Sequence, residues 1–441
     1  MTVRFHEALA NAQAFLAQHA GFGARRLLVR DLKGRLRVFL TDKVDLATWT
    51  RGLNQQSRQE RDRLAPALHA SLGAWSYNEA VVLQDAAVLA DFNAAWDDPD
   101  ARPLDATTHF LERGVIGADW LRTPLPNRPP APPRATLFGL KGGVGRSTAL
   151  AVWARFLSEN KGLRVLVVDL DLDAPGVGSM LLPSADHPDF GVVDWFVERA
   201  VGQTDGLAAD LAATSPLTAG DGQITVVPAA GLKTGLYLPK LARVYQGDHI
   251  NGADVGFGGL VAELVDDLEA HWQPDVVLLD SRSGLHDVGA VALTRLHALG
   301  LLFAVDTPQT WAGYAHLVAP WRDAAMWRSD RLLPVRRNLQ VVAGQVPERD
   351  RDRYLARLRA NAYDTFLPLY DEEADAVLAA PDLLAFGPDD EAAPHYATPI
   401  YWSAVLADWD PVHRPDAVTA EQIEGAFGSF LERATELLGL S

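Results

Sequence analysis

The residues of this chain best suited to chemistry lie in a glycine-rich stretch, KGGVGRST, at positions 141–148. Three glycines let a backbone bend tightly and bring its N–H groups close to an anion. A helix-forming segment follows directly, and the positive end of a helix attracts the same anion. The stretch therefore has the pattern of a phosphate-binding loop, in which Ser147 lies where a hydroxyl can bind magnesium.

The loop departs from the general phosphate-loop pattern, GxxxxGK(S/T), at one position. Arg146 precedes the serine where the pattern has lysine, and a lysine occurs earlier in the loop, at Lys141. Arginine keeps the positive charge but is longer, planar and able to bond two oxygens at once. The charge that holds phosphate is therefore present, in a different geometry.

Aspartates follow two other apolar runs. The segment DLDLDAPG places Asp169, Asp171 and Asp173 at alternate positions, which lie on one side of the backbone if the strand continues that far. Such carboxylates repel one another unless a cation, a water network or a phosphate–magnesium unit lies beside them. A solvent-facing strand end also tolerates aspartate, so a purely structural interpretation stays open. Asp280 ends another apolar run, where a carboxylate can lie behind magnesium, and Gly284 can bring a backbone N–H to a terminal phosphate.

From Ala135 onward, apolar runs alternate with helix-forming segments. We expect strands at residues 135–140, 164–171, 223–229, 274–280, 300–307 and 339–346. This alternation predicts an α/β fold, a mostly parallel, doubly wound sheet with helices on both faces. Ligands bind such sheets at the carboxyl ends of the strands, which is where Lys141, the aspartates and Gln345 lie.

Residues 1–122 are expected to form a separate N-terminal α+β domain without a catalytic motif. Residues 25–40 predict a β-hairpin with a turn at Lys33-Gly34 and an outward basic side made of Arg25, Arg26, Arg30, Lys33, Arg35 and Arg37. That side is either a solvated sheet face or a docking surface for an acidic partner or nucleic acid. We also expect a helix near residues 80–95.

Residues 123–134, TPLPNRPPAPPR, are rich in proline and predict an extended, stiff linker before a second domain at residues 135–441. Within that domain we expect a charged surface helix at residues 348–360, a core strand and loop within residues 399–415, and an amphipathic final helix near residues 419–438. Glutamates dominate the polar face of the final helix, which favours packing against the sheet over binding to a membrane.

Composition narrows the class of protein. The chain has 441 residues and no cysteine, which excludes disulfides and thiolate metal sites. It has no apolar run of about twenty residues, and its first residues lack the apolar core of a signal peptide, so we expect a cytoplasmic protein without a membrane span. The net charge is −17, and residues 1–123 carry fifteen basic and fifteen acidic residues, so the acidic excess lies beyond them. This acidity argues against DNA as a partner.

From Ala135 to Val346 the chain resembles the ParA/MinD-type ATPases, a P-loop family with a deviant Walker A motif. The family loop reads KGGxGK(S/T)(S/T), and a D-x-D motif and a strand-ending aspartate with a glycine four residues later complete the pattern. This chain matches these motifs at Lys141, Gly142, Gly143, Gly145, Ser147 and Thr148, at Asp169 and Asp171, and at Asp280 and Gly284. A variant with DxDxDxPG and DSR(S/T)G motifs is especially similar, and such proteins occur in bacterial signalling and conflict gene clusters.

The resemblance implies ATP and Mg²⁺ as ligands and a homodimer that encloses the nucleotide at its interface. Lys141 would reach the phosphates held by the other subunit, Asp171 would orient the attacking water, and Arg146 would replace the usual catalytic lysine. The implied metal-site residues are Ser147, Asp169 and Asp280, and the implied nucleotide contacts are Gly142, Gly143, Val144, Gly145, Arg146, Ser147, Thr148 (at the α-phosphate), Gly284, and, at the base, Gln345 to Pro347.

Arg146 leaves three outcomes open: slowed hydrolysis with binding intact, hydrolysis at a normal rate, and loss of nucleotide binding. The leading function is an ATP-binding, slowly hydrolysing switch that dimerises around nucleotide and controls a protein partner through residues 1–122, in a bacterial signalling or defence system. The alternative is a non-hydrolysing, nucleotide-stabilised adaptor in a larger complex. A third function, DNA partitioning, is disfavoured by the acidic charge.

Overall fold

The computed structural model describes residues 2–19, 24–41, 55–83, 89, 91–98, 100–114, 117–122, 124–125, 131–218, 220–245, 248–250, 253–322, 333–371, 384–407 and 409–440. The chain forms two compact units, Met1–Ala118 and Asp119–Ser441, which we treat separately. Within the described residues, no helix has the length and apolar character needed to cross a membrane.

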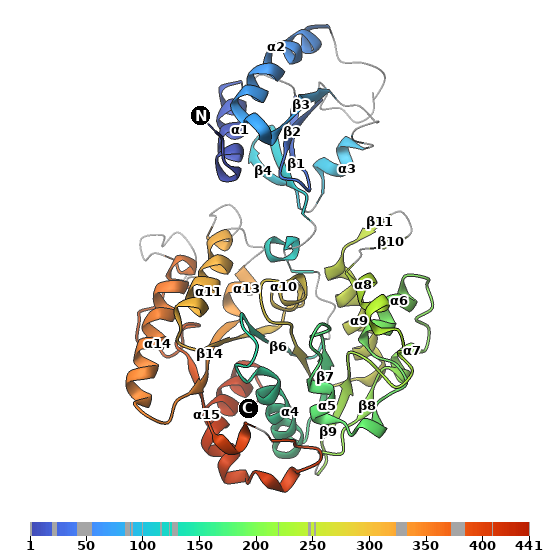
Figure 1. Cartoon of the computed structure of the whole chain (residues 1–441), viewed down its shortest axis with the longest axis vertical. Helices are drawn as coiled ribbons and strands as arrows, with labels where there is room; N and C mark the ends of the chain where they lie inside the picture. Colours follow the sequence, from blue (N-terminus) through green and yellow to red (C-terminus); the bar gives the residue numbers. More distant parts are fainter. Residues whose placement is uncertain are drawn as a thin grey trace. The chain divides into compact units, whose positions relative to one another are not determined.

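The second unit is built on an eight-stranded sheet in the order β15-β14-β13-β6-β12-β7-β9-β8 (Figure 1). Neighbouring strands run parallel except β8 and β9, which are antiparallel. The strands are β6 Arg134–Gly139, β7 Arg164–Asp169, β8 Ala213–Thr214, β9 Gln223–Val227, β12 Val276–Asp280, β13 Leu299–Ala304, β14 Leu339–Val346 and β15 Thr398–Tyr401. The predicted α/β fold with a mostly parallel sheet is confirmed, and each of the apolar runs named above contains a strand.

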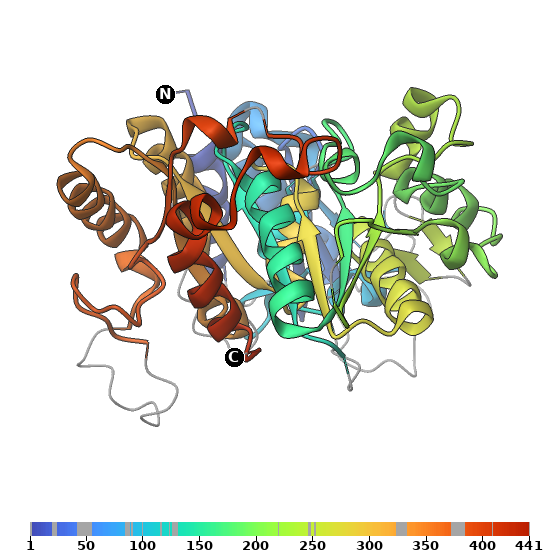
Figure 2. The ribbon, with the colours of Figure 1, turned by 90° about the horizontal axis from the view of Figure 1, so that it is seen from below.

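Helices cover both faces of this sheet. On one face are α4 Arg146–Lys161, α5 Val177–Leu181 and α15 Ala420–Leu437, with α4 and α15 side by side (Figure 2). On the other are α6 Val192–Arg199, α9 Phe257–Trp272, α10 Asp287–Thr294, α11 Pro308–Trp321 and α14 Arg351–Phe366. Because both faces are buried, the central strands are apolar along their length. The unit also contains α7 Leu207–Asp210, α8 Tyr237–Val244, α13 Leu333–Arg337 and the antiparallel pair β10 Asp248–Ile250 and β11 Ala253–Val255.

The carboxyl-terminal expectations are confirmed. Helix α14 occupies the charged segment, and β15 begins the expected core strand and loop. Helix α15 packs against the sheet through buried residues that include Phe427, Phe430 and Leu431. Its amphipathic face is therefore used inside the unit.

The expectation that the β7 strand continues to Asp171 is wrong. The strand ends at Asp169, because the Asp171 N–H turns back to Asp169 Oδ1 at 3.1 Å. The Ala174 N–H then donates to Asp171 O at 3.1 Å. Short polar side chains that bond nearby backbone groups favour turns over strand continuation. The three aspartates therefore do not share one strand face: Asp169 and Asp171 are buried, whereas Asp173 is exposed.

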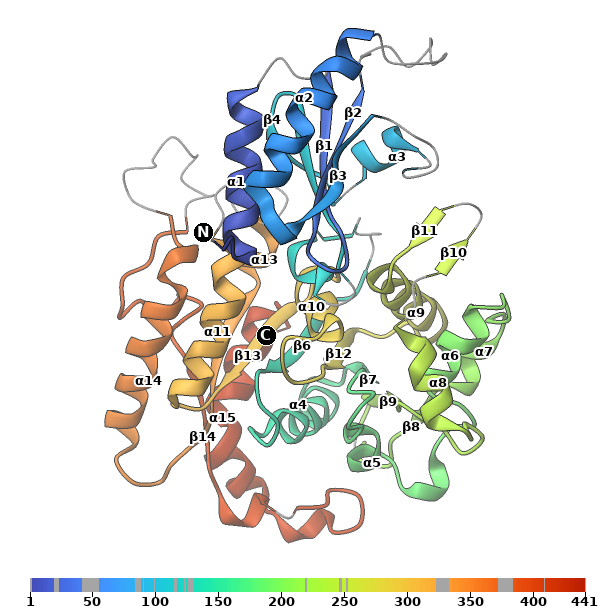
Figure 3. The same cartoon turned by 45° about the horizontal axis from the view of Figure 1, so that its top comes forward.

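The first unit contains a five-stranded sheet in the order β3-β2-β1-β5-β4 (Figure 3). Its elements are α1 Phe5–Gln18, β1 Arg25–Arg30, β2 Leu36–Thr41, α2 Gln55–Leu72, β3 Ser76–Leu83, α3 Phe92–Trp96, β4 Arg102–Asp105 and β5 Thr108–Glu112. Helices α1 and α2 pack on one face of the sheet and α3 packs on the other. The predicted α+β class and the predicted β1–β2 hairpin are confirmed, with Gly34 in the turn at φ +81°.

The helix expected near residues 80–95 is wrong in its first part. Residues 76–83 form β3, which pairs in parallel with β2, and helix appears only at Phe92–Trp96. Pairing with β2 buries Ala80 and Val81, and such burial decides strand formation more than local propensity does. Residues 84–88 and 90 of this expectation lie outside the described residues.

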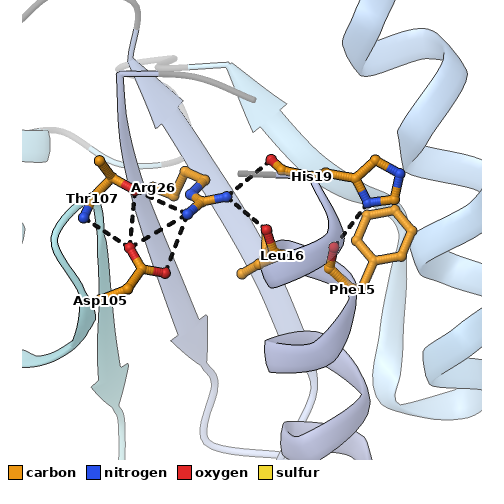
Figure 4. Close-up of polar contacts among 6 residues, drawn as sticks. All are labelled: Phe15, Leu16, His19, Arg26, Asp105 and Thr107. Atoms are coloured by element: carbon orange, nitrogen blue, oxygen red, sulfur yellow. Dashed lines mark hydrogen bonds and ion pairs between the residues drawn. The ribbon is translucent and has the colours of Figure 1, made fainter. Parts of the chain in front are cut away.

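The expected outward basic side of the hairpin is also wrong for two of its arginines. Arg26 is 1% exposed and donates to the carbonyls of Leu16 and His19 at 2.8 and 3.1 Å, and to Asp105 Oδ2 at 3.2 Å (Figure 4). Arg30 is 6% exposed and pairs with Glu112 at 3.1 Å. Strand β1 lies between β2 and β5 with helices on both sheet faces, so Arg26 and Arg30 are enclosed. They are therefore structural, and the hairpin does not present them as a docking surface.

The two units divide between Ala118 and Asp119, whereas the sequence placed the end of the first domain at residue 122. Described parts of the proline-rich segment lie in the second unit: Leu125 N–H donates to Arg295 O at 3.0 Å, and Pro133 O accepts from Val277 N–H at 3.0 Å. Residues 123 and 126–130 of the predicted linker lie outside the described residues.

Candidate functional site

The glycine-rich loop joins the central strand β6 to helix α4. Gly143 and Gly145 have φ values of +73° and +87°, which residues with a Cβ rarely adopt. A Cβ placed on Gly142, Gly143 or Gly145 would meet no heavy atom within 4 Å, so one side of the loop is open. The first turn of α4 has no acidic residue and no side-chain cap. Its backbone N–H groups are therefore available to an anion.

Two aspartates lie together beneath this loop. Asp169 and Asp280 end the neighbouring parallel strands β7 and β12 and are paired in register. Asp169 is 0% exposed and Asp280 is 1% exposed. Asp280 Oδ2 accepts from Ser147 Oγ at 2.7 Å, whereas Asp280 Oδ1 is buried without a hydrogen-bond partner. A buried carboxylate oxygen without a partner costs free energy unless a cation or water satisfies it.

Burial controls the charge of this aspartate pair. Burial raises the pKa of Asp169 well above its ordinary value, and the neighbouring Asp280 charge raises it further. Burial raises the pKa of Asp280 to about 6, although the Ser147 hydrogen bond and the Arg146 charge both lower it. Two adjacent buried carboxylates therefore favour a shared proton or a nearby cation.

The side chains of Ser147 and Asp280 fit a Mg²⁺ ion that also binds water and phosphate better than a metal ion bound by protein groups alone. Among the described residues, no group of three or more His, Cys, Asp and Glu side chains is placed to hold a metal ion. Mg²⁺ keeps several waters and binds through one or two protein groups plus phosphate oxygens. The Ser147 hydroxyl and the unpartnered Asp280 Oδ1 match that requirement, with Asp169 behind them.

Arg146 is turned inward. It is 7% exposed, its NH1 donates to Ser281 O at 2.6 Å, and its NH2 lies 3.4 Å from Asp171 Oδ2. A Cβ on Gly139 would lie 3.1 Å from Arg146 Cδ, so the small residue at the end of β6 leaves room for the arginine stem. The guanidinium thus joins the loops after β7 and β12. Burial raises the pKa of Asp171, and the Arg146 charge opposes that rise.

Lys141 lies on the exposed side of the loop. Its Nζ is 3.5 Å from Gln309 Oε1, at the limit of a hydrogen bond. Exposure leaves this side chain able to reach a ligand or a second chain. Of the two basic side chains in the loop, Lys141 is therefore exposed and Arg146 is buried.

The other predicted nucleotide contacts have mixed surroundings. The Gly284 N–H donates to Gly139 O at 3.0 Å, and Gln345 Nε2 donates to Gly143 O at 2.7 Å. A phosphate contact at Gly284 or a base contact at Gln345 would require those bonds to break. Val144 is buried, whereas Thr148 and Pro347 are partly exposed.

A second ion pair near the loop was not predicted. Arg282 NH1 lies 2.6 Å from Asp173 Oδ2, which also accepts from Tyr245 Oη at 2.7 Å. Burial and this hydrogen bond raise the pKa of Tyr245. Arg282 lies within the SRSG sequence directly after Asp280. Since that strand end was expected beside the aspartates of residues 169–173, the positive charge of Arg282 could have predicted this ion pair. Tyr245 has no local signal, because only folding brings it to Asp173.

The site thus consists of a glycine-rich loop between a central parallel strand and a helix, with buried carboxylates on the two strands beside it. Such an arrangement can hold a phosphate chain together with a divalent cation. No protein-family model and no curated protein sequence matches this chain.

Solved structures similar to this chain include ParA/MinD family ATPases. A ParA family ATPase from Chlorobium tepidum is 12% identical with a TM-score of 0.43, and the match covers 68% of this chain and 99% of that one. pNOB8 ParA bound to nonspecific DNA is 15% identical with a TM-score of 0.42, covering 70% and 99%. MinD complexed with Mg-ADP from Pyrococcus horikoshii is 14% identical with a TM-score of 0.39, covering 70% and 98%. Our expectation that DNA is not a partner stays a prediction.

Proposed function

We propose that the second unit binds ATP with Mg²⁺ and hydrolyses it slowly, as a switch that forms a dimer around nucleotide and regulates a protein partner through the first unit. The observation that carries this proposal is the open, uncapped loop at α4 beside the Ser147–Asp280 pair. An unpartnered Asp280 oxygen directly behind the loop is difficult to explain by folding alone.

The chain's own residues suggest how binding and hydrolysis are linked. Bound magnesium would neutralise phosphate charge next to Ser147 and Asp280. Arg146 must leave Ser281 O and Asp171 before its guanidinium can reach a phosphate. Asp171 then loses the cation that opposes its pKa rise, which makes its carboxylate a better acceptor for a proton or a water hydrogen bond.

The inward Arg146 accounts for slow hydrolysis in this proposal. Its bonds stabilise the state without nucleotide, so part of the binding free energy is used to break them. A lysine at this position is compact and would not bridge the same two loops. The proposed dimer uses the exposed Lys141, which in this scheme contacts the phosphates bound by a second copy.

Paired measurements of phosphate release and oligomeric state test the proposal. With ATP and Mg²⁺ the wild-type chain should dimerise, as measured by light scattering, and release phosphate slowly. Asp171→Ala should bind ATP and remain a dimer without releasing phosphate. Asp186→Ala, an exposed aspartate of the same unit, serves as the control and should behave as wild type. A wild-type chain that stays monomeric at saturating ATP would refute the dimer.

One observation favours the alternative, a nucleotide-stabilised adaptor without turnover. Arg146 donates to Ser281 O and pairs with Asp171, as expected of a structural arginine. Phosphate release that disappears in Asp171→Ala would exclude this function. The partner, the bacterial signalling or defence setting, the cytoplasmic location and the exclusion of DNA remain parts of the proposal.

A further inference from the structure

The segment that enters the second unit is bound tightly to it. We call residues Asp119–Leu125 the strap; residue 123 is outside the described residues, and Asp119 is covalently joined to Ala118, the last residue of the first unit. Asp119 is 2% exposed, and its Oδ1 lies 3.3 Å from Arg122 NH1 and 3.8 Å from Arg295 Nε. A buried aspartate with two arginines resists displacement, because removing a partner leaves a buried charge.

The strap is attached to the carboxyl-terminal end of α10. Thr294 Oγ1 lies 2.9 Å from Asp119 O and 2.8 Å from Ala290 O, so its one proton is shared between the strap and its own helix, and the Leu125 N–H donates to Arg295 O at 3.0 Å. His297 Nε2 lies 2.5 Å from Leu125 O. These bonds come from three positions spread over the last residue of the helix and the turn after it. A shift of α10 must therefore move the strap or break several bonds.

The strap also packs against the strand that leads into the glycine-rich loop. The Trp120 ring lies edge-on to Phe138 of β6 with centroids 5.6 Å apart, and Trp120 O accepts from Trp321 Nε1 at 2.7 Å. Helix α10 touches the same ring, since a Cβ on Gly289 would lie 2.7 Å from Phe138. The strap and α10 thus both contact the Phe138 side chain of β6.

The amino-terminal end of α10 begins at the nucleotide site. Asp287 starts the helix three residues after Gly284, whose N–H is bonded to Gly139 O in the loop strand. The His286 N–H in turn donates to Gly284 O at 2.9 Å. A phosphate that draws the Gly284 N–H away from Gly139 would pull directly on the start of α10.

We propose that the strap and α10 form the link by which nucleotide at the loop changes the state of the first unit. This inference rests on the proposed function, since it requires nucleotide at the loop. Packed elements move as units rather than deform, so a displacement at residue 284 reaches the strap through one short helix. The strap then transmits it across the Ala118–Asp119 bond.

Amide hydrogen exchange on the full chain, with and without ATP and Mg²⁺, tests this link. Nucleotide should change the exchange rates of the Arg122 and Leu125 amides by about fivefold or more, a typical allosteric coupling. It should also change exchange in β5 of the first unit. Insertion of six Gly/Ser residues between Ala118 and Asp119 should preserve the strap response and abolish the β5 response.

A second variant tests the link in the reverse direction. Thr294→Val removes the hydroxyl that bonds Asp119 O, and if nucleotide and the strap are coupled, a looser strap should in turn change ATP affinity. Thr225→Val, a buried threonine in β9, is the matched control and should leave affinity unchanged.

The outcomes separate the two proposals. Calorimetry of the wild-type chain first reports whether ATP binds; absence of binding overturns the proposed function, and the link with it. If ATP binds and protects residues 141–148 while the Arg122, Leu125 and β5 amides stay unchanged, the link is wrong and the proposed function stands. Equal ATP affinities for wild type and Thr294→Val, with both chains folded, also contradict the link.

Discussion

Arg146→Lys should lower the stability of the nucleotide-free chain and tighten ATP binding at the same time. The arginine donates a 2.6 Å charge-assisted hydrogen bond to Ser281 O and pairs with Asp171 at 3.4 Å, in a setting where both side chains are largely buried. Hydrogen bonds that involve a charged group contribute about 1.5–3 kcal/mol. A lysine is shorter and its ammonium is compact, so it cannot reach both partners as the two guanidinium nitrogens do.

Stability should fall while ATP affinity rises, because the Arg146 bonds that stabilise the folded chain must break when ATP binds. Losing them should cost the free chain about 1.5–3 kcal/mol of unfolding free energy. Since nucleotide no longer has to break them, and about 1.4 kcal/mol is a tenfold change in affinity, ATP should bind about tenfold or more tightly. Phosphate release should also become faster, because a lysine can contact the phosphates without first leaving Ser281.

Urea denaturation without nucleotide and calorimetric titration with ATP and Mg²⁺ measure the two quantities. Arg155→Lys is the matched control: Arg155 lies on the same helix and donates to Glu159 at 2.7 Å, in a partly exposed i,i+4 pair. That change should alter stability by only about 0.3–0.5 kcal/mol and leave ATP affinity unchanged. An Arg146→Lys chain of unchanged stability that binds ATP more weakly would refute the inward-arginine account.

Three further predictions follow from the same site. Because burial raises the pKa of Asp280 to about 6, the folded chain binds protons more tightly than the unfolded one, so wild-type stability should fall as pH rises from about 4 through 6. Asp280→Asn should reduce that fall in denaturation curves, and the part that remains comes from Asp169, whose pKa burial also raises. Gly145→Ala should lose about 1–2 kcal/mol because of its φ of +87°, whereas Gly142→Ala, which has room for a Cβ, should unfold as wild type does. Arg282→Gln removes the ion pair with Asp173, which keeps its hydrogen bond from Tyr245, and should lower the rate of phosphate release more than ATP affinity; an unchanged rate would remove this pair from the site.

Local patterns were sufficient to predict most of the second unit. A parallel strand buried on both faces is a continuous apolar run, so its position can be read without knowing its neighbours. The glycine-rich loop is equally local, because positive φ values at Gly143 and Gly145 require that residue type. The carboxylates at the ends of β7 and β12 followed from the rule that parallel strands end at the same edge.

Features that depend on distant partners could not be predicted. The burial of Arg26 requires Asp105 from another strand, and β3 forms because β2 is available to pair with it. The strap was read as domain end and linker, since proline content is a local signal, whereas the Trp120 packing partners lie on β6 and α11. In each case the deciding contact is with a residue far away in the sequence.

The direction of Arg146 is the clearest example of such a feature, and it changes the meaning of the substitution. In sequence, arginine for lysine is one altered residue within a phosphate loop. In the structure, the longer Arg146 side chain contacts Ser281 O in the loop after β12 and Asp171 in the loop after β7. Asp173 lies two residues after Asp171 and Arg282 lies one residue after Ser281, and these two side chains form an ion pair. The two arginine–aspartate pairs therefore connect the loops that follow β7 and β12. A shorter lysine at this position would lose the contacts with Ser281 O and Asp171, so the effect of Arg146 depends on the residues that it contacts.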